Sequence, residues 1–202
     1  WKGKPFKSLV SPKNSMKGRN NNGHITNINR AGGHKKMYRH VDFYRKKFDM
    51  EATVERVEYD PNRSCYIMLV KFEDGSHAYY LAPQKIKIGD KIENGSKKEI
   101  KVGNCMPLQD IPVGINIHNV EIQPGAGGKI ARSAGSSVTI SGLDGNYSII
   151  KLASGEVRKI DSRSLATIGT LSNPDQKNIK IGKAGRSRWL GRKPHTRGVV
   201  KN

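Results

Sequence analysis

Hydrophobic and polar residues alternate with a period of two along most of the chain, which is the pattern of β-strands. The first strand is expected at Met37–Tyr44 and the next at Ala52–Tyr59, where a change of phase predicts a β-bulge near Arg56. Cys65–Phe72 is apolar in both phases, so this strand is expected to be covered on both faces. A second change of phase falls near His118 in a later strand.

Two Asp-Gly turns, at Asp74-Gly75 and Asp144-Gly145, predict hairpins that lie 70 residues apart. Short strands at roughly 8–12-residue spacing surround both turns, and this spacing is typical of small barrels. We therefore predict two small barrels with a boundary in Cys105–Val113, where two prolines interrupt the pattern. The remaining strands are expected at His77–Leu81, Ile86–Ile92, Ile115–Ile122, Val138–Ile140, Tyr147–Leu152 and Val157–Ile160.

The net charge of +20 is concentrated in two terminal segments. Residues 1–49 hold 13 Lys and Arg against two acidic residues, residues 180–202 hold eight against none, and the part between them is nearly neutral. Segments this basic repel themselves, so we expect extended tails that become ordered on a polyanion such as RNA. A merely solubilising role is disfavoured because the tails also carry Phe6, Tyr38 and Trp189.

Several classes of protein do not fit this sequence. No apolar run approaches the roughly 18–20 residues of a membrane helix, so no bilayer span is expected. The two cysteines, Cys65 and Cys105, are too few for a disulfide scaffold or a four-cysteine zinc site. The six histidines form no compact ligand pairs, and no Ser or Cys lies in a nucleophile-elbow context, so neither a metal site nor catalysis is expected.

Three glycine-containing basic segments are candidates for phosphate binding, because glycine lets a backbone approach a phosphate closely. Two are the N-terminal runs Arg19–His24 and Ala31–Lys36. The third is Gly182–Pro194, whose Trp189 either stacks on a base or packs against a barrel. Pro124–Lys129 is also glycine-rich, but its flanking residues break the nucleotide-loop pattern, so we expect a mobile loop along an RNA backbone.

A series of short motifs runs along the chain from its first residues to its last. The motifs are Gly18–Gly23, Gly32–Lys35, Glu58–Arg63, Ile111–Gly114, His118–Glu121, Ala131–Gly135, Gly155–Arg158 and Gly182–Gly191. In this order they resemble the universal large-subunit ribosomal protein L-two family in its bacterial or organellar form. The resemblance implies an all-β fold, with an OB-fold barrel followed by an SH3-like barrel and basic extensions at both ends.

The implied domains are a basic extension at 1–36, the OB-fold barrel at 37–106, the SH3-like barrel at 107–175 and a second basic extension at 176–202. The implied function is that of a non-enzymatic structural constituent of the large ribosomal subunit. Such a protein binds large-subunit rRNA and supports subunit association and the peptidyl-transferase region. The alternatives are a free RNA-binding regulator or chaperone built from small barrels and, third, an enzyme acting on RNA.

The implied partners are large-subunit rRNA, neighbouring large-subunit proteins and the small subunit across an intersubunit bridge. No membrane, small-molecule substrate or cofactor is expected, and any structural Mg²⁺ would be bound through the rRNA. Within the family, the two arginines that match Arg63 and Arg132 are important for rRNA binding. The residues expected to bind rRNA are Arg19, Asn20, Asn21, His34, Lys35, Arg63, Arg132, Lys183, Arg186, Arg188, Trp189, Arg192, Lys193 and Arg197.

The chain departs from the family pattern in three places. Ala31 stands where a third glycine is usual, and Asn27–Arg30 replaces a more basic stretch. The family continues beyond Asn202 into a Pro-rich, His-Gly-Gly-Gly segment that carries the histidine nearest to peptidyl transfer, and His195 is not that residue. This segment is expected to be disordered, cleaved or supplied by another chain.

The composition gives a hint of the source. Lys, Asn and Ile make up 58 of the 202 residues, which indicates an AT-rich genome. Arg56–Cys65 and Gly185–Gly191 are similar to alphaproteobacterial and mitochondrial members of the family. We expect a mitochondrial ribosomal protein, with the bacterial cytoplasm as the alternative and the plastid third.

Overall fold

A computed structural model describes residues 3–201, and the chain forms two compact units. The body consists of the residues up to Val10 together with Arg39–Lys177. The tail unit combines Ser11–Tyr38 with the residues from Asn178 onward. In the described part of the chain, no helix has the length and apolar character needed to cross a membrane.

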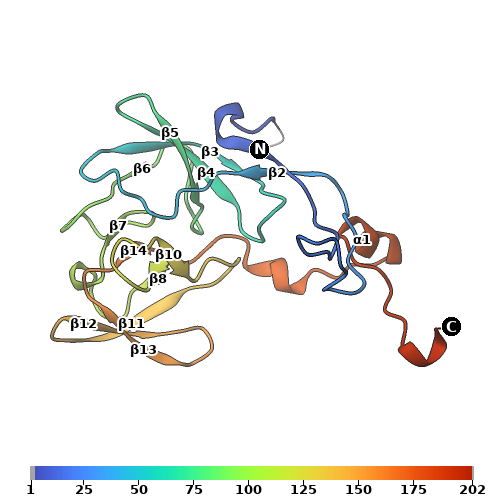
Figure 1. Cartoon of the computed structure of the whole chain (residues 1–202). Helices are drawn as coiled ribbons and strands as arrows, with labels where there is room; N and C mark the ends of the chain where they lie inside the picture. Colours follow the sequence, from blue (N-terminus) through green and yellow to red (C-terminus); the bar gives the residue numbers. More distant parts are fainter. Residues whose placement is uncertain (1–2, 202) are drawn as a thin grey trace. The chain divides into compact units, whose positions relative to one another are not determined.

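The first barrel of the body is built on a four-stranded antiparallel sheet with strand order β5-β4-β3-β6. The register of β3 against β4 shifts between Val54 and Arg56, which confirms the bulge expected from the phase change. Figure 1 shows these strands together in cyan and green. Their bounds are β3 (Ala52–Glu58), β4 (Ile67–Phe72), β5 (His77–Leu81) and β6 (Lys91–Ile92).

Strand β4 is buried on both faces over residues 67–70, as its apolar residues in both phases predict. Met68 and Val70 pack into one core cluster together with residues of β3 and β6. Ile67 and Leu69 point the other way into a second cluster that includes Leu171, from the end of the second barrel. Apolar residues in both phases of one strand therefore serve two separate cores.

The second barrel is built on a six-stranded antiparallel sheet with strand order β13-β12-β11-β8-β14-β7. Its core includes Ile117, Ile140 and Ile150, all fully buried. The β11–β12 hairpin forms where the second Asp-Gly turn was expected. The bounds are β7 (Cys105–Pro107), β8 (Asn116–His118), β11 (Val138–Asp144), β12 (Tyr147–Lys151), β13 (Val157–Asp161) and β14 (Leu165–Ile168).

The other elements are short. β9 (Val120–Glu121) pairs with β10 (Gly128–Ile130), and β1 (Val10–Lys13) pairs with β2 (Lys36–Arg39). Short 3₁₀ helices lie at Lys7–Leu9, Leu108–Asp110, Pro174–Asn178 and Gly198–Val200. The α-helix α1 (Ala184–Trp189) has six residues. The helix α1 was not expected from the sequence, because six residues are too few to show a helical period.

The strand expected at Met37–Tyr44 is shorter in the structure, where β2 ends at Arg39. The Asp42 carboxylate accepts hydrogen bonds from the backbone N–H groups of Tyr44, at 2.8 Å, and Arg45, at 3.1 Å. Arg45 also has a left-handed φ of +51°. This local side-chain turn competes with continued strand pairing and bends the chain.

Two other expectations differ from the structure. In Ile86–Ile92 only the last two residues form a strand, because Gly89 is left-handed and the Asp90 carboxylate accepts the Lys87 N–H at 2.7 Å. Cys105–Val113, expected to interrupt the pattern, begins with β7, which pairs with β14. Two residues that the sequence assigns to the first barrel thus extend the sheet of the second.

Arg45 joins the two barrels from a buried position. Its side chain donates to Thr167 Oγ1 of β14 at 3.0 Å and to the Gly103 carbonyl at 2.9 Å. Its guanidinium also lies 4.3 Å from the ring centroid of Tyr80 in β5. Because no carboxylate lies within ion-pair distance of it among residues 3–201, neutral acceptors and the aromatic face stabilise this buried charge.

The second phase change also has a local cause. Asn119 has a left-handed φ of +51° and separates β8 from β9, so the following side chains change face. Beside it, His118 is buried and its Nδ1 lies 2.8 Å from the Gly169 carbonyl, which defines Nδ1–H as the donor. Burial lowers the pKa of His118 to about 4, so the imidazole is neutral at pH 7.

The first prediction concerns this histidine. Protonation of His118 favours the unfolded chain, where its pKa is about 6.5, so its contribution to stability is complete above pH 6.5. The free energy of unfolding should fall by up to about 3 kcal/mol as the pH drops from 6.5 to 4. Urea unfolding of the wild type and of His118→Asn, which keeps a donor for Gly169, measures the difference.

His24→Asn, at an exposed histidine, is the control and should leave the wild-type pH dependence intact. An identical pH dependence in the His118→Asn variant would contradict the assignment of the loss to His118. The carboxyls of Asp74 and Asp161, whose pKa values are lowered to about 2 by hydrogen bonds from Lys47 and Arg163, lose their contribution to stability below about pH 5. Both carboxyls are present in the wild type and in both variants, so the comparison between these proteins isolates His118.

Candidate nucleic-acid interface

Arg63 is held by the turn that precedes it. The carboxylate of Asp60 is fully buried and accepts the Asn62 N–H at 2.9 Å, which closes the turn. The other Asp60 oxygen forms an ion pair with Arg63 Nε at 2.9 Å. This contact occupies one edge of the guanidinium and leaves the edge with the two Nη groups for an external anion.

Arg132 reaches the same place from the second barrel. It follows Ala131, whose φ is +52°, and its Nη1 donates to the Gly128 carbonyl at 3.3 Å. Its own carbonyl accepts a weak hydrogen bond from the Cys65 thiol, at 3.5 Å, in the first barrel. Arg132 is exposed and, among the described residues, has no carboxylate within ion-pair distance.

A single aromatic ring supports both arginines. The guanidinium carbon of Arg63 lies 5.1 Å from the ring centroid of Phe43, and that of Arg132 lies 4.5 Å from it. Both distances are within the range of cation–π contacts. The Phe43 backbone carbonyl accepts the Gly128 N–H at 3.0 Å, which ties the ring to the second barrel.

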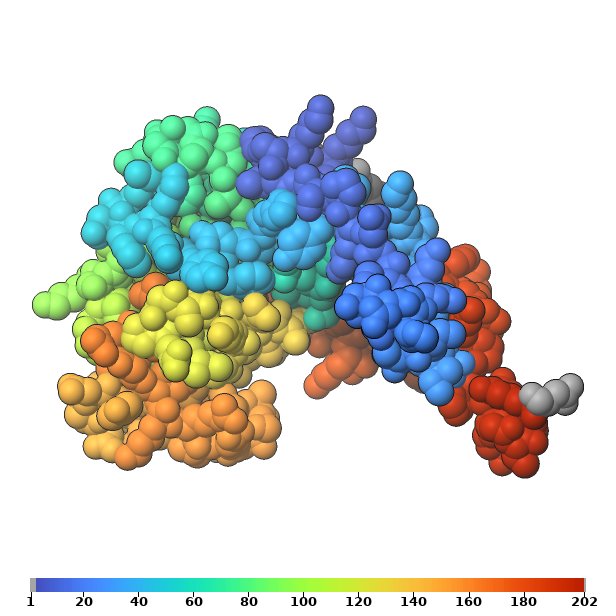
Figure 2. Space-filling view, viewed as in Figure 1, coloured from blue at the N-terminus to red at the C-terminus, as the bar shows by residue number. Residues whose placement is uncertain are grey.

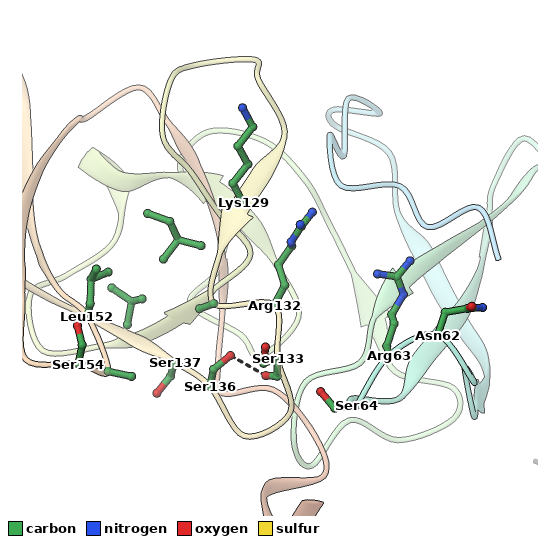
Figure 3. Close-up of a pocket in the computed structure, with 14 residues that line it drawn as sticks. Asn62, Arg63, Ser64, Lys129, Arg132, Ser133, Ser136, Ser137, Leu152 and Ser154 are labelled. Carbon is green, nitrogen blue, oxygen red and sulfur yellow. Dashed lines mark hydrogen bonds between the residues drawn. The ribbon is translucent and has the colours of Figure 1, made fainter. Parts of the chain in front are cut away.

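The two arginines border an open hollow of about 600 Å³ between the barrels. In Figure 3 the terminal nitrogens of Arg63, Arg132 and Lys129 point toward the same side of it. Hydroxyls line the opposite wall, where Ser136 donates to the Ser133 carbonyl at 2.6 Å. Three cations beside small polar groups form a surface suited to phosphate and sugar contacts.

The glycine-rich loop Pro124–Lys129 contributes little to this surface through its backbone. The buried carboxylate of Glu121 accepts the N–H groups of Gly125, at 3.1 Å, and Gly127, at 2.9 Å. The same carboxylate accepts the Leu165 N–H at 3.0 Å. An internal anion therefore occupies the donors that a phosphate would need, and this arrangement differs from a nucleotide-binding loop.

In the tail unit, the Arg19–His24 segment is a compact turn. The side-chain oxygen of Asn20 accepts the N–H groups of Asn22 and His24, both at 3.0 Å. Part of Asn20 therefore shapes the turn and is not available to a ligand. Arg19 and Asn21 are exposed on either side of it.

The tails were expected to be extended, but the structure pairs them with each other. Ala31 N–H donates to the Gly191 carbonyl at 2.8 Å, and His34 N–H donates to the Trp189 carbonyl at 2.9 Å. Figure 2 shows N-terminal residues in blue against C-terminal residues in red. Backbone pairing of this kind needs no apolar core, so the low hydrophobicity of the tails does not prevent it.

Trp189 lies at the end of α1 and is 57% exposed. The Lys183 ammonium lies 4.9 Å from its ring centroid. Of the two alternatives left open by the sequence, this exposure favours a ring available for stacking. The other expected C-terminal residues are exposed as well, namely Lys183, Arg186, Arg188, Arg192, Lys193 and Arg197.

The expected residues therefore fall into two sets. Arg63 and Arg132 lie in the body, and all the others lie in the tail unit. His34 and Lys35 of the tail unit are exposed as well. Phe43 and Lys129 were not among the residues expected from the sequence. Phe43 is one alternating apolar residue among many, and no local signal distinguishes it. Its role depends on two arginines 20 and 89 residues further along the chain.

Comparison with known proteins assigns the chain to two ribosomal domains, one of them RNA-binding, in agreement with the basic surfaces described above. Residues 6–94 match the family model described as Ribosomal Proteins L2, RNA binding N-terminal domain. Residues 101–202 match the model described as Ribosomal Proteins L2, C-terminal domain. The all-β body is consistent with the OB-fold and SH3-like barrels of these domains, so the expected fold class is confirmed.

Individual relatives are similar over the whole chain. It is 85% identical to "Large ribosomal subunit protein uL2" of Pelagibacter ubique (strain HTCC1062), covering 72% of that protein. It is 59% identical to the protein of the same name from Granulibacter bethesdensis, covering 73% of it. The corresponding protein of Rickettsia bellii (strain OSU 85-389) is 58% identical, with 74% covered. The chain therefore belongs to the ribosomal protein L2 family.

Proposed function

We propose that the chain binds large-subunit rRNA through two surfaces, the arginine pair of the body and the basic tail unit. The chain is a structural, non-enzymatic ribosomal protein of the large subunit. The observation that carries the binding proposal is the convergence of Arg63 and Arg132 on the ring of Phe43. One charge from each barrel is thereby held at a fixed position beside the other.

The arrangement can bind phosphate in a defined pose. Asp60 orients the Arg63 guanidinium through Nε, and the Gly128 carbonyl orients Arg132 through Nη1. Phe43 limits the rotation of both groups, so little side-chain entropy remains to be lost when a phosphate binds. A planar guanidinium then donates two parallel N–H bonds to phosphate oxygens, which a lysine ammonium cannot do.

The finer expectations are part of the proposal. We propose from the family resemblance that the chain supports subunit association, an intersubunit bridge and the peptidyl-transferase region. Contact with neighbouring ribosomal proteins has support in the chain itself, because Leu143, Tyr147 and Val157 of adjacent strands are at least half exposed. We propose no cofactor of the chain's own, and Mg²⁺ would act through rRNA. A free regulator or chaperone is not favoured by the family.

The location of the ribosome is also proposed. The relatives compared above come from bacteria, and the 85% identity to the Pelagibacter ubique protein favours the bacterial cytoplasm over the mitochondrion. The Lys, Asn and Ile content fits this alternative equally well, because it reflects genome composition and not compartment. The expected mitochondrial origin stays a prediction.

The second prediction separates positioned arginines from diffuse charge. Arg63→Lys and Arg132→Lys keep the charge but lose the planar fork, so each should weaken binding to an rRNA fragment by about tenfold. Lys201→Ala removes one exposed tail charge and should have a smaller effect while reducing the salt dependence by ~1 unit. Filter binding at two salt concentrations measures both quantities.

Circular dichroism and a thermal melt identify any loss of folding, which matters for Arg63→Lys because Asp60 would lose its partner. Equal, small effects of all three substitutions would mean that the body binds RNA only through unspecific charge. In that case the proposed arginine surface would be wrong.

The third prediction concerns the ring under the arginines. Phe43→Leu keeps an apolar side chain and the net charge, but removes the aromatic face that both guanidiniums contact. We expect weaker rRNA binding, by about fivefold or more, with an unchanged salt slope because the number of phosphate contacts is the same. Phe48→Leu is the control, since its ring is 49% exposed. Matching affinities of the two variants would contradict the role of Phe43.

A further inference from the structure

The tail unit combines two segments that ought to repel each other. Residues 11–38 and 178–202 together hold 14 Lys and Arg and no Asp or Glu. At physiological salt, charges within about 8 Å of each other still interact, so assembling these segments has an electrostatic cost. No acidic side chain of the unit itself compensates this charge.

Specific contacts nevertheless join the two segments. Besides the two backbone bonds already described, Lys193 N–H donates to the Asn29 carbonyl at 2.9 Å. The side chains of Asn29 and His195 also meet, with Asn29 Nδ2 2.6 Å from His195 Nδ1. These contacts follow one another along both tail segments, so the antiparallel pairing of the two segments has a defined register.

Two glycines make the close approach possible. A Cβ atom on Gly33 would lie 2.6 Å from the Trp189 carbonyl oxygen and 2.8 Å from the Gly191 nitrogen. A Cβ atom on Gly191 would lie 2.9 Å from the Ala31 carbonyl oxygen. All of these neighbours are backbone atoms of the opposite tail, so they cannot move aside without breaking the pairing.

The same pairing sets two like charges opposite each other. Arg30 and Arg192 form an antiparallel bridge, and both are exposed. Residues opposite each other in such a bridge have Cβ atoms roughly 5 Å apart, and like charges there are destabilising. A phosphate that accepts bonds from both guanidiniums would convert this repulsion into two charge-assisted interactions.

We propose that the two tails form one composite surface for the RNA backbone, in which Arg30 and Arg192 bind the same phosphate group. The inference rests on the proposed function, because the ligand is the rRNA bound by the whole chain. The tails pair in the RNA-bound state, and the phosphate supplies the negative charge that the unit lacks. Trp189, exposed beside Lys183, favours RNA over an acidic protein because it offers a base a stacking face.

Glycine substitutions in the full chain test the pairing. Gly33→Ala and Gly191→Ala place a methyl group against the opposite tail. Gly23→Ala and Gly182→Ala are matched controls, because these glycines are also left-handed, with φ of +79° and +80°, but have no atom within 4 Å of the added Cβ. Backbone strain is therefore similar in each pair, and only the contact between the tails differs.

We expect Gly33→Ala and Gly191→Ala to bind an rRNA fragment about tenfold more weakly than their controls, with a salt slope lower by about one unit. Hydrogen exchange adds a direct measure. The His34 amide, which donates to Trp189, should become protected on adding RNA in the wild type and in Gly23→Ala, but not in Gly33→Ala. A thermal melt of the body reports whether each variant is folded.

A double-mutant cycle tests the shared phosphate. If Arg30 and Arg192 bind one phosphate, Arg30→Gln and Arg192→Gln should each weaken binding, and the double variant should be little weaker than either alone. Arg19→Gln combined with Arg192→Gln is the control pair, and its effects should multiply. Multiplying effects in both pairs would overturn the shared site.

The outcomes distinguish this inference from the proposed function. If the wild-type chain does not bind the rRNA fragment at all, the proposed function fails. If it binds, but each glycine variant equals its control, the tails act separately and only the composite surface fails. The same hydrogen-exchange experiment with polyglutamate, at the same total negative charge as the RNA, tests the other class of ligand. If polyglutamate protects the His34 amide as strongly as RNA does, the surface binds acidic proteins instead.

Discussion

The chain must place its positive charges densely enough to bind phosphate, but their mutual repulsion must not unfold the protein. The rest of the structure depends on this constraint. The chain places most of its excess charge outside the part that folds around apolar cores. The body balances 23 Lys and Arg with 17 Asp and Glu, so its barrels form as those of any small all-β protein do. The tail unit has no such core, and its pairing relies on backbone hydrogen bonds and glycines.

Inside the body, each buried charge has specific partners. Glu121 accepts three backbone N–H groups, and Asp60 binds both a turn and Arg63. Arg45 uses a hydroxyl, a carbonyl and the face of Tyr80. Because an uncompensated buried charge is costly, these partners also determine the geometry. Arg45 fixes one barrel to the other, and Asp60 fixes the direction of Arg63.

The two proposed surfaces solve the same problem in different ways. In the body, a carboxylate and an aromatic ring hold two arginines in place before any ligand arrives, so binding requires little reorganisation. In the tail unit, Arg30 and Arg192 face each other with no acidic residue in the unit to offset them. The ligand itself would supply that charge, so folding of the tails and RNA binding are coupled.

The sequence alone determined the features that depend on neighbouring residues. Alternation predicted the strands, the phase change in β3 predicted its bulge, and the doubly apolar run predicted a strand with two buried faces. The charge distribution predicted basic tails, and ordered motifs indicated the family. These signals are local because side-chain period, turn chemistry and charge are properties of short segments.

Only the tertiary structure decided which distant residues meet. Phe43 supports arginines from two barrels, and Arg30 lies opposite Arg192, 162 residues away. The end of β2 at Arg39, by contrast, has a local cause, because the Asp42 carboxylate accepts the N–H groups of Tyr44 and Arg45, and the alternating pattern does not reveal this turn. Neither contact at the candidate sites leaves a signal in one sequence. The pairing energy arises from groups brought together by the fold, and each residue on its own is an ordinary phenylalanine or arginine.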